Sequence, residues 1–405
     1  MRKIGIITIH NSPNYGASLQ AFALYEYIRQ QGAEVEIIDL HRPNAHADYE
    51  QSKKYLPYRL QKKSSVNQLI ITVKKLLYTI AYGKKKAFTM GYYDDALTKF
   101  EVFNSVIRMS KPYKSVDAIY ADPPVYDVYI TGSDQLWNPT QRFCLEPFFL
   151  TFVPNNAVKI SYASSIGISS LTNIEKNDFK KWLSSYNAIS VREKQAQKML
   201  NELLMGKNVF QVSDPTFLLD RDFWKNLAIV PDNREPYILF FPLMHDVYFL
   251  EFAIRVAHES GKKLLVVDQK KHMEGSYVLI KDAGPREWLG LIANADLVLT
   301  DSFHGTVFSI LLSSHNFYSY IAPTNKRGAR ITDLLETFGL TVLEAMTMGL
   351  PVIVPTEGGI AEMVEDGVNG YKIDVQNLDE IENKINKIFQ CEQEKSRQFL
   401  DKYIQ

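Results

Sequence analysis

Short apolar runs alternate with segments of helical periodicity along most of the chain, and this alternation constrains the fold more than any other feature. The first unit reads KIGIITI, a loop HNSPNYGAS, the helical segment LQAFALYEYIRQQG and then EVEIIDL, which is a βαβ pattern. Further strand-like runs are YDVYITGS, KISYASS, AISVRE and VFQVSDPTFLL, followed by PYILFFPL, KLLVVDQ, YVLIKD, ADLVLTD and NFYSYIA. We therefore expect an α/β fold with two Rossmann-like domains facing a cleft.

The segment LAIVPDNREP has the composition of a loop and is the expected hinge between the two sheets. This hinge predicts a first domain at 1–225, which includes a basic helical insertion at about 51–93, and a second domain at 226–340. The 405 residues are 46% hydrophobic and 23% charged, which supplies enough apolar material for two cores.

Charge and cysteine content exclude several classes of protein. Basic and acidic residues number 46 each, so no overall field attracts the chain to nucleic acid. Cys144 and Cys391 lack the spacing of a paired motif and are expected to be buried thiols in a reducing compartment. No apolar run reaches the roughly 18 residues of a spanning helix, and the start MRKIGIITIH shows no cleavage site. These features predict a cytoplasmic protein.

The segment 51–93 is rich in lysine and contains no acidic side chain. Apolar residues recur within it at helical spacing, namely Leu69, Ile70, Val73, Leu76, Leu77 and Ile80. Two interpretations stay open. The helix packs on its own domain with a solvated lysine rim, or it docks on an anionic membrane surface.

The cluster TDSFHGTVFSILL places His304 where a strand ends and a helix begins. An imidazole at this position can transfer a proton, and the positive helix end favours its neutral form. N–H groups near Ser302, Gly305 and Thr306 can hold a phosphate or carboxylate. The first loop offers a similar helix start with Asn14 and Gly16. The alternative is that these residues only turn the chain.

Other polar residues follow equivalent strands. ITGSDQLWNP contains Ser133, Asp134, Trp137 and Asn138, which suit a sugar because hydroxyls need polar partners and the C–H face packs on an indole. Arg192 suits a carboxylate or phosphate. The alternatives are a turn or cap for Asp134 and a core anchor for Trp137. A basic loop, TNKRGAR, adds Lys326, Arg327 and Arg330, which could neutralise an anionic substrate near His304.

Seven motifs in order closely resemble the polysaccharide pyruvyl transferase family over about residues 1–340. They are NYGASLQAFALYEYI, YITGSDQLWNP, SYASSIG, SVREK, VSDPTFLL, GPREWLGLIANADLVLTDSFHGTVFSI and TNKRGARITDLLETFGL. The resemblance implies a fold like that of GT-B glycosyltransferases and transfer of a pyruvyl group from phosphoenolpyruvate to a glycan, as a cyclic ketal. It implies no metal and no nicotinamide cofactor.

The resemblance also implies roles for individual residues. His304 would transfer a proton, Arg192 would hold phosphate or carboxylate, and Asp134 with Trp137 would face the glycan. One position departs from the family pattern, because Ser302 stands where well-studied members carry an arginine. Either Arg327 or Arg330 supplies that cation, or the donor is not phosphoenolpyruvate.

The stretch ETFGLTVLEAMTMGLPVIVPTEGG resembles a different family. Glu336 and Glu344 enclose seven residues, like the E-x7-E signature of retaining nucleotide-sugar glycosyltransferases, and the resemblance continues to about residue 374. In register, 304–321 and 339–356 share the same loop, helix and strand pattern. We infer a chimera joined within ETFGL. The tail 341–405 then completes the second domain or is appended to it, and PVIVP is expected beside an existing sheet or in an appendage.

Three functions stay open at this point. The first is a pyruvyl transferase of surface polysaccharide biosynthesis that uses His304 and Arg192. The second is a nucleotide-sugar glycosyltransferase that uses Glu336 and Glu344. The third is a catalytically inactive fusion product that binds glycans or acts as a scaffold. A lipid-linked glycan at the cytoplasmic membrane face is a further expectation, because of the basic segment 51–93.

Overall fold

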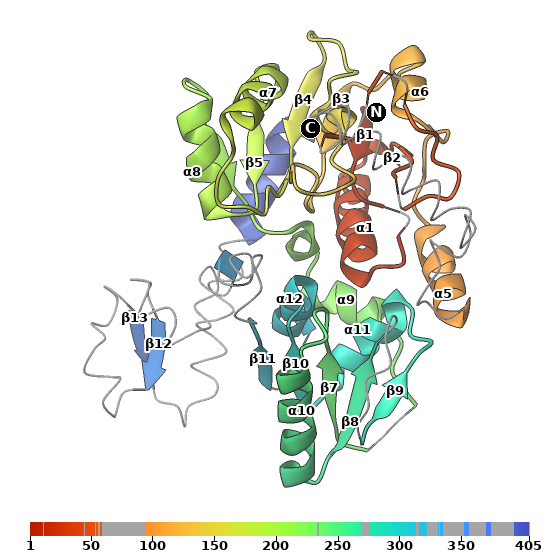
Figure 1. Cartoon of the computed structure of the whole chain (residues 1–405), viewed down its shortest axis with the longest axis vertical. Helices are drawn as coiled ribbons and strands as arrows, with labels where there is room; N and C mark the ends of the chain where they lie inside the picture. Colours follow the sequence, from red (N-terminus) through yellow and green to blue (C-terminus); the bar gives the residue numbers. More distant parts are fainter. Residues whose placement is uncertain are drawn as a thin grey trace, which may run out of the picture.

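Two large parallel sheets, with helices packed against them, form the main body of the described part of the chain (Figure 1). The computed structural model describes residues 1–10, 12–43, 45–52, 54–55, 57–58, 94–232, 235–268, 276–312, 316–321, 331, 333–334, 352–355, 370–373 and 393–404. The expected α/β class with two Rossmann-like units is confirmed.

The first sheet has the strand order β2-β1-β3-β4, and every neighbouring pair is parallel. Its strands are β1 (Lys3–Ile7), β2 (Glu34–Ile37), β3 (Val128–Thr131) and β4 (Val158–Ser161). Strands β5 (Ile189–Val191) and β6 (Val209–Gln211) pair with each other, and the bridge from Ile160 to Ala188 connects them to β4. All residues of β3 are buried, as expected of a strand covered on both faces.

The second sheet has the order β11-β10-β7-β8-β9 and is also parallel. Its strands are β7 (Tyr237–Phe241), β8 (Lys263–Val267), β9 (Val278–Ile280), β10 (Leu297–Thr300) and β11 (Asn316–Ser319). In both sheets the order reverses at the first strand, between β1 and β3 and between β7 and β10. Open α/β sheets bind ligands at the carboxyl ends of the strands beside such a reversal.

Several of the described helices begin at a side-chain cap. The described helices include α1 (Tyr15–Gln30), α5 (Asp94–Asn104), α6 (Val116–Ala121), α7 (Asn173–Leu183), α8 (Lys194–Leu203), α9 (Arg221–Leu227), α10 (Val247–Ser260), α11 (Pro285–Ala293) and α12 (Phe303–Leu312), with 3₁₀ turns η1 (Glu146–Phe149) and η2 (Pro215–Leu218). Thr172 and Glu175 form a capping box at α7, which satisfies two N–H groups. None of the described helices is long and apolar enough to cross a membrane.

Helix α1 belongs to the first domain but packs against the second. The ring of Tyr15 stacks on Trp288 with 4.9 Å between ring centroids and meets Phe241 edge-on at 5.6 Å. The Tyr15 hydroxyl donates a 2.7 Å hydrogen bond to the Ala283 carbonyl. Aromatic pairs of this kind add about 0.5–1.5 kcal/mol each beyond the area they bury. One apolar core therefore continues from the first sheet to the second.

The carboxyl-terminal tail holds a sheet of its own. Strand β12 (Val352–Pro355) pairs in parallel with β13 (Gly370–Ile373), while β11 keeps the position beside β10. Of the two expected placements of PVIVP, the one beside an existing sheet is wrong for the described residues, because β12 pairs with a later strand of the tail itself. The other placement, in an appendage, stays a prediction. NFYSYI, and not PVIVP, holds the position beside β10. PVIVP in that position would have contradicted the inferred chimera.

The last helix, at 393–404, returns to the first domain. Gln393 donates to the Phe217 carbonyl at 2.8 Å, and Ser396 accepts from the Ser213 N–H at 3.0 Å. The Tyr27 hydroxyl donates to Asp401 at 2.9 Å. Leu400 is fully buried in the shared core. The end of the tail is thus held by the first domain and not by the second alone.

The predictions for the two cysteines and for the basic segment 51–93 have different outcomes. Cys144 is buried, as expected, and burial raises the pKa of its thiol. Cys391 and residues 59–93, which hold the apolar stripe and most of the lysines of the basic segment, lie outside the described residues.

Replacing Leu400 by Ala should lower the free energy of unfolding by about 2–5 kcal/mol, because it empties a fully buried site next to the first domain. Chemical and thermal unfolding would measure this. Gln398→Ala on the exposed face of the same helix is the control and should change stability by less than about 0.5 kcal/mol. Equal effects would show that the helix does not stabilise the first domain.

Candidate functional site

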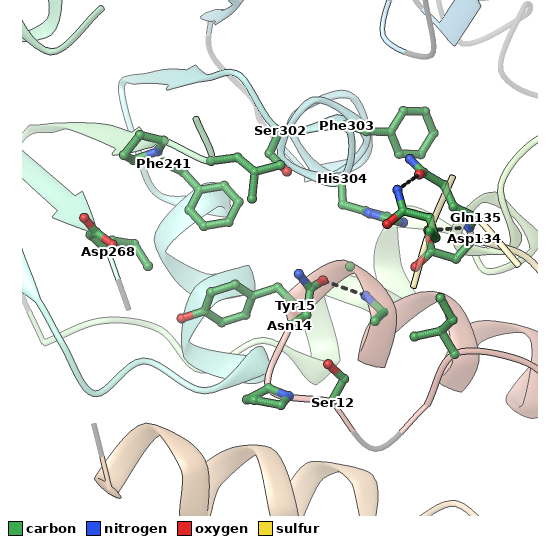
Figure 2. Close-up of a pocket in the computed structure, with 18 of the residues that line it drawn as sticks. Ser12, Asn14, Tyr15, Asp134, Gln135, Phe241, Asp268, Ser302, Phe303 and His304 are labelled. Atoms are coloured by element: carbon green, nitrogen blue, oxygen red, sulfur yellow. Dashed lines mark hydrogen bonds between the residues drawn. The ribbon is translucent and has the colours of Figure 1, made fainter. Parts of the chain in front are cut away.

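A cavity of about 310 Å³ lies between the two domains at the carboxyl ends of both sheets. Loops after β1, β2, β3, β7, β8 and β10 line it, and β1, β3, β7 and β10 are the strands beside the two reversals. Its wall includes Ser12, Asn14, Tyr15, Gly16, Arg42, Asp134, Gln135, Phe241, His245, Asp268, Ser302, Phe303 and His304 (Figure 2).

His304 lies in the first turn of α12 and packs against the amino end of α1. A Cβ atom on Gly16 would come within 2.0 Å of His304 Nδ1, so only glycine permits this approach. Beside it, Asn14 caps α1 by accepting from the Ala17 N–H at 3.0 Å. The structure therefore brings Asn14, Gly16 and His304 together, although they are nearly 300 residues apart in sequence.

Two N–H groups at the amino end of α12 already have partners within the protein. Ser302 accepts the Gly305 N–H at its hydroxyl oxygen (3.3 Å) and the Thr306 N–H at its carbonyl oxygen (2.9 Å). Neither Gly305 nor Thr306 lines the cavity. The prediction that these two N–H groups hold the donor is thus wrong for this arrangement, whereas Ser302 does reach the cavity.

Asp214 connects His304 to the first domain. One carboxylate oxygen of Asp214 lies 2.7 Å from Arg192 Nη1 and 3.6 Å from His304 Nε2, and accepts from the Ser133 hydroxyl at 3.3 Å. The other oxygen accepts from Thr216. Burial alone would raise the pKa of Asp214, but His304 and Arg192 hold it well below its usual range. The carboxylate is therefore ionised behind the imidazole.

Asp214 was not predicted as a site residue, although it stands in the motif VSDPTFLL. The available signal was an aspartate directly after a strand and before a proline. Asp214 caps the η2 turn, and this local role alone accounts for an aspartate at this position. The sequence therefore did not indicate its pairing with Arg192 and His304.

Arg192 is buried beside two carboxylates. Besides Asp214, it contacts Glu193 at 3.5 Å, and its guanidinium lies 4.2 Å from the centre of the Phe303 ring. Burial would lower the pKa of Arg192, but Glu193 and Asp214 raise it. Arg192 does not line the cavity. The predicted direct contact of Arg192 with a phosphate or carboxylate of the substrate is therefore not possible in this structure. Arg192 instead positions Asp214 and Phe303.

The expected glycan-binding residues divide into two groups. Asp134 lines the cavity with a left-handed backbone at φ 76, a strained conformation that clusters at functional sites. Trp137 is fully buried, donates to the Phe148 carbonyl and stacks on Phe149. Trp137 is thus a core anchor, and its predicted contact with the glycan is wrong. Asn138 is also buried and accepts from Thr140.

The predicted cations Lys326, Arg327 and Arg330, and the glutamates Glu336 and Glu344, lie outside the described residues. A cation that sequence reasoning missed lies at the cavity instead. Arg42 donates to the His10 carbonyl at 3.0 Å, and its guanidinium lies 5.6 Å from the Phe143 ring centre. Burial lowers the pKa of Arg42 to about 10, which leaves it charged at neutral pH.

His10, Asp39 and His46 place potential metal ligands within 4.8 Å of one another. His10 Nδ1 donates to the Thr8 carbonyl, so Nε2 is directed at Asp39, 3.0 Å away. His46 Nδ1 accepts from the Arg42 N–H, which leaves the proton of the neutral ring on Nε2. Burial, with Arg42, lowers the pKa of His46 to about 3 and keeps the ring neutral. Only two lone pairs converge, so the cluster suits a shared proton better than a metal ion.

Two parallel α/β domains whose strand-order reversals face one polar cavity form a two-domain, GT-B-like architecture. The chain belongs to the polysaccharide pyruvyl transferase family, whose model matches residues 14–313. Residues 320–405 match the model of glycosyl transferases group 1. Both resemblances predicted from the sequence are confirmed.

Curated relatives match a short part of the chain. Sucrose synthase 4 of Oryza sativa subsp. japonica is 46% identical over 79 residues, which is 19% of this chain and 10% of that protein. Sucrose synthase of Melioribacter roseus is 56% identical over 52 residues, 13% of this chain and 7% of that protein. The chain therefore spans a tenth or less of the length of these relatives.

Solved structures match over most of the chain at low identity. UDP-GlcNAc 2-epimerase from Methanocaldococcus jannaschii is 12% identical with a TM-score of 0.37, covering 96% of this chain and 92% of that chain. The glycosyltransferase SnogD from Streptomyces nogalater is 9% identical with a TM-score of 0.43, covering 99% of each chain.

Gly16→Ala should destabilise the protein by about 1–3 kcal/mol, because the new methyl group collides with the buried His304 ring. In a His304→Ala background the same change should be neutral or slightly stabilising, since alanine favours helices over glycine by about 1 kcal/mol. A double-mutant cycle of unfolding free energies checks this. Additive effects would mean that the ring does not pack on Gly16.

Asp214→Asn should lower stability at neutral pH by about 3–5 kcal/mol, because Arg192 and His304 lose their shared carboxylate. The folded-state pKa of Asp214 is depressed. Its contribution is thus fully present above the ordinary aspartate pKa of about 3.9 and is lost as the pH falls below it. Unfolding measured from neutral to acidic pH should show the two proteins converging. A difference independent of pH would contradict the pairing.

Proposed function

We propose that this chain transfers a pyruvyl group from phosphoenolpyruvate to a glycan, as a cyclic ketal, in surface polysaccharide biosynthesis. The observation that carries the proposal is the position of His304. It lies at a cavity shared by both domains, with the ionised carboxylate of Asp214 behind it, in a chain of the polysaccharide pyruvyl transferase family.

The reaction needs what this cavity offers. Two sugar hydroxyls add to the enol carbon, the methylene carbon gains a proton, and phosphate leaves. His304 is the proton-transfer residue, because a buried carboxylate orients an imidazole and balances its charge. Asp134 and Gln135 line the same cavity, and their carboxylate and amide groups can hydrogen-bond to sugar hydroxyls (Figure 2).

The donor carries a phosphate and a carboxylate, so it needs a cation. Ser302 stands at the position of the family's arginine and is used to cap α12. Arg42 is a buried cation on the cavity wall. We assign to Arg42 the contact with the anionic donor, since a desolvated guanidinium binds carboxylate and phosphate strongly.

A second candidate function comes from the tail. The match of residues 320–405 to glycosyl transferases group 1 favours a nucleotide-sugar donor, with Glu336 and Glu344 as its binding residues. The two functions need different donors, so donor binding separates them.

Thermal unfolding with phosphoenolpyruvate and with a panel of nucleotide sugars tests the donor. A ligand that binds only the folded chain at about a hundredfold excess over its Kd adds about 2.7 kcal/mol of stability. Stabilisation by phosphoenolpyruvate supports the proposal. Stabilisation by a nucleotide sugar alone would overturn it in favour of the glycosyltransferase.

The acceptor and its location stay predictions. A lipid-linked glycan at the cytoplasmic membrane face would suit the cations of 51–93. Flotation of the protein with vesicles that contain or lack anionic lipid tests this. Equal flotation would argue against membrane docking.

His304→Gln should lower kcat for ketal formation by about 10²–10⁴-fold, the usual contribution of a proton-transfer residue. Stabilisation by phosphoenolpyruvate should persist, because Arg42 is unchanged. Phosphate release coupled to ketal product measures the rate. Full activity in a folded His304→Gln protein would remove the histidine from the mechanism.

A further inference from the structure

A second histidine lies at the same cavity in a fixed loop. His245 stands between β7 and α10 with a left-handed backbone at φ 54. On one side the Asp301 carboxylate accepts the N–H groups of Leu243 and Met244. On the other, Asp246 caps α10. The loop is thus held at both ends in a conformation that is strained for a histidine, as is common at functional sites.

A buried carboxylate accompanies this ring as well. His245 Nδ1 lies 3.3 Å from Asp268 Oδ2, at the end of β8, and Asp268 is 4% exposed. The His245 side chain is 20% exposed, compared with 10% for His304. Both histidines therefore reach the cavity with an aspartate beside the ring. In Figure 2, Asp268 lies on the Phe241 side, away from His304, Asp134 and Gln135.

The proposed reaction has two protons to place. Each of the two sugar hydroxyls loses one, the methylene carbon gains one, and the leaving phosphate gains the other. A single imidazole can hold only one exchangeable proton at a time for this purpose. Two imidazoles at one cavity can handle both transfers without a free hydronium or hydroxide ion.

We propose that His245, oriented by Asp268, is the second proton-transfer residue of this site, and this inference rests on the proposed pyruvyl transfer. In the first step protonated His304 gives its proton to the methylene carbon, the first hydroxyl oxygen bonds to the central carbon, and His245 takes the hydroxyl proton. The product of this step is a tetrahedral phosphate adduct.

The second step restores both rings. The bond from the central carbon to the phosphate oxygen breaks, and phosphate leaves with the proton from His245. The second hydroxyl oxygen bonds to the same carbon, and its proton returns to His304. One ketal and one phosphate form, and each histidine ends in its starting state. No oxidant, reductant or metal is consumed.

His245→Asn tests the inference, because asparagine tolerates the left-handed backbone and removes the imidazole. The expected result is a fall in kcat of about 10²–10⁴-fold, with stabilisation by phosphoenolpyruvate preserved. His258→Asn is the matched control, since His258 is an exposed histidine at the far end of α10. It should leave kcat unchanged.

A cavity variant separates proton transfer from structure. His245→Gly also fits the left-handed backbone, and added imidazole should restore part of its lost activity. A merely structural role for His245 would give no rescue. Asp268→Asn should lower kcat with little change in the KM for phosphoenolpyruvate, because Asp268 acts through the ring.

The outcomes are distinct from those of the proposed function. If the wild-type chain forms no ketal, pyruvyl transfer itself fails. If the wild-type chain is active and His245→Asn keeps its kcat within about threefold, the role of His245 is overturned while pyruvyl transfer stands. Loss of activity in His245→Gly without imidazole rescue would also overturn it.

Discussion

The buried carboxylate of Asp214 is the interaction on which the candidate site depends. It holds Arg192 from the first domain and His304 from the second within one charge network. Asp214 and Arg192 both belong to the first domain and pair within it, and His304 joins their network only when the second domain is docked. An unpaired charge at this depth would cost several kcal/mol. The same docking seats the His304 ring against Gly16 and the Tyr15 ring on Trp288. Apolar packing brings the domains together, and the charges fix their register.

Parallel strands explain why the site forms where it does. Polar residues directly after β1, β3, β7, β8 and β10 are carried to the facing edges of two sheets. The facing edges of the two sheets enclose the cavity. The resulting wall has two histidines, each beside an aspartate, and one buried guanidinium. This composition suits proton transfer next to an anionic donor.

The sequence predicted what local pattern determines. Alternating periodicity gave both sheets, and strand-end reasoning placed Asn14, Gly16, Asp134 and His304 at the edges that form the cavity. It could not predict which polar groups meet across long separations. Arg192 and Trp137 also follow strands, but neither lines the cavity. Arg192 donates a hydrogen bond to Asp214, and Trp137 donates one to the Phe148 carbonyl. Asp214 and Arg42 were missed because their partners lie in other elements. The sequence pattern of a helix start also did not indicate that Ser302 would accept the N–H groups of Gly305 and Thr306.

The returning helix at 393–404 has a mechanical consequence. The chain passes from the first domain to the second near residue 230, and passes back before Gln393, so two covalent crossings join the domains. The second crossing ends in a helix that is hydrogen-bonded to the first domain through Gln393, Ser396 and Asp401. Any motion that parted the two domains would break the 3.6 Å contact between Asp214 and His304, while both covalent crossings would still join them.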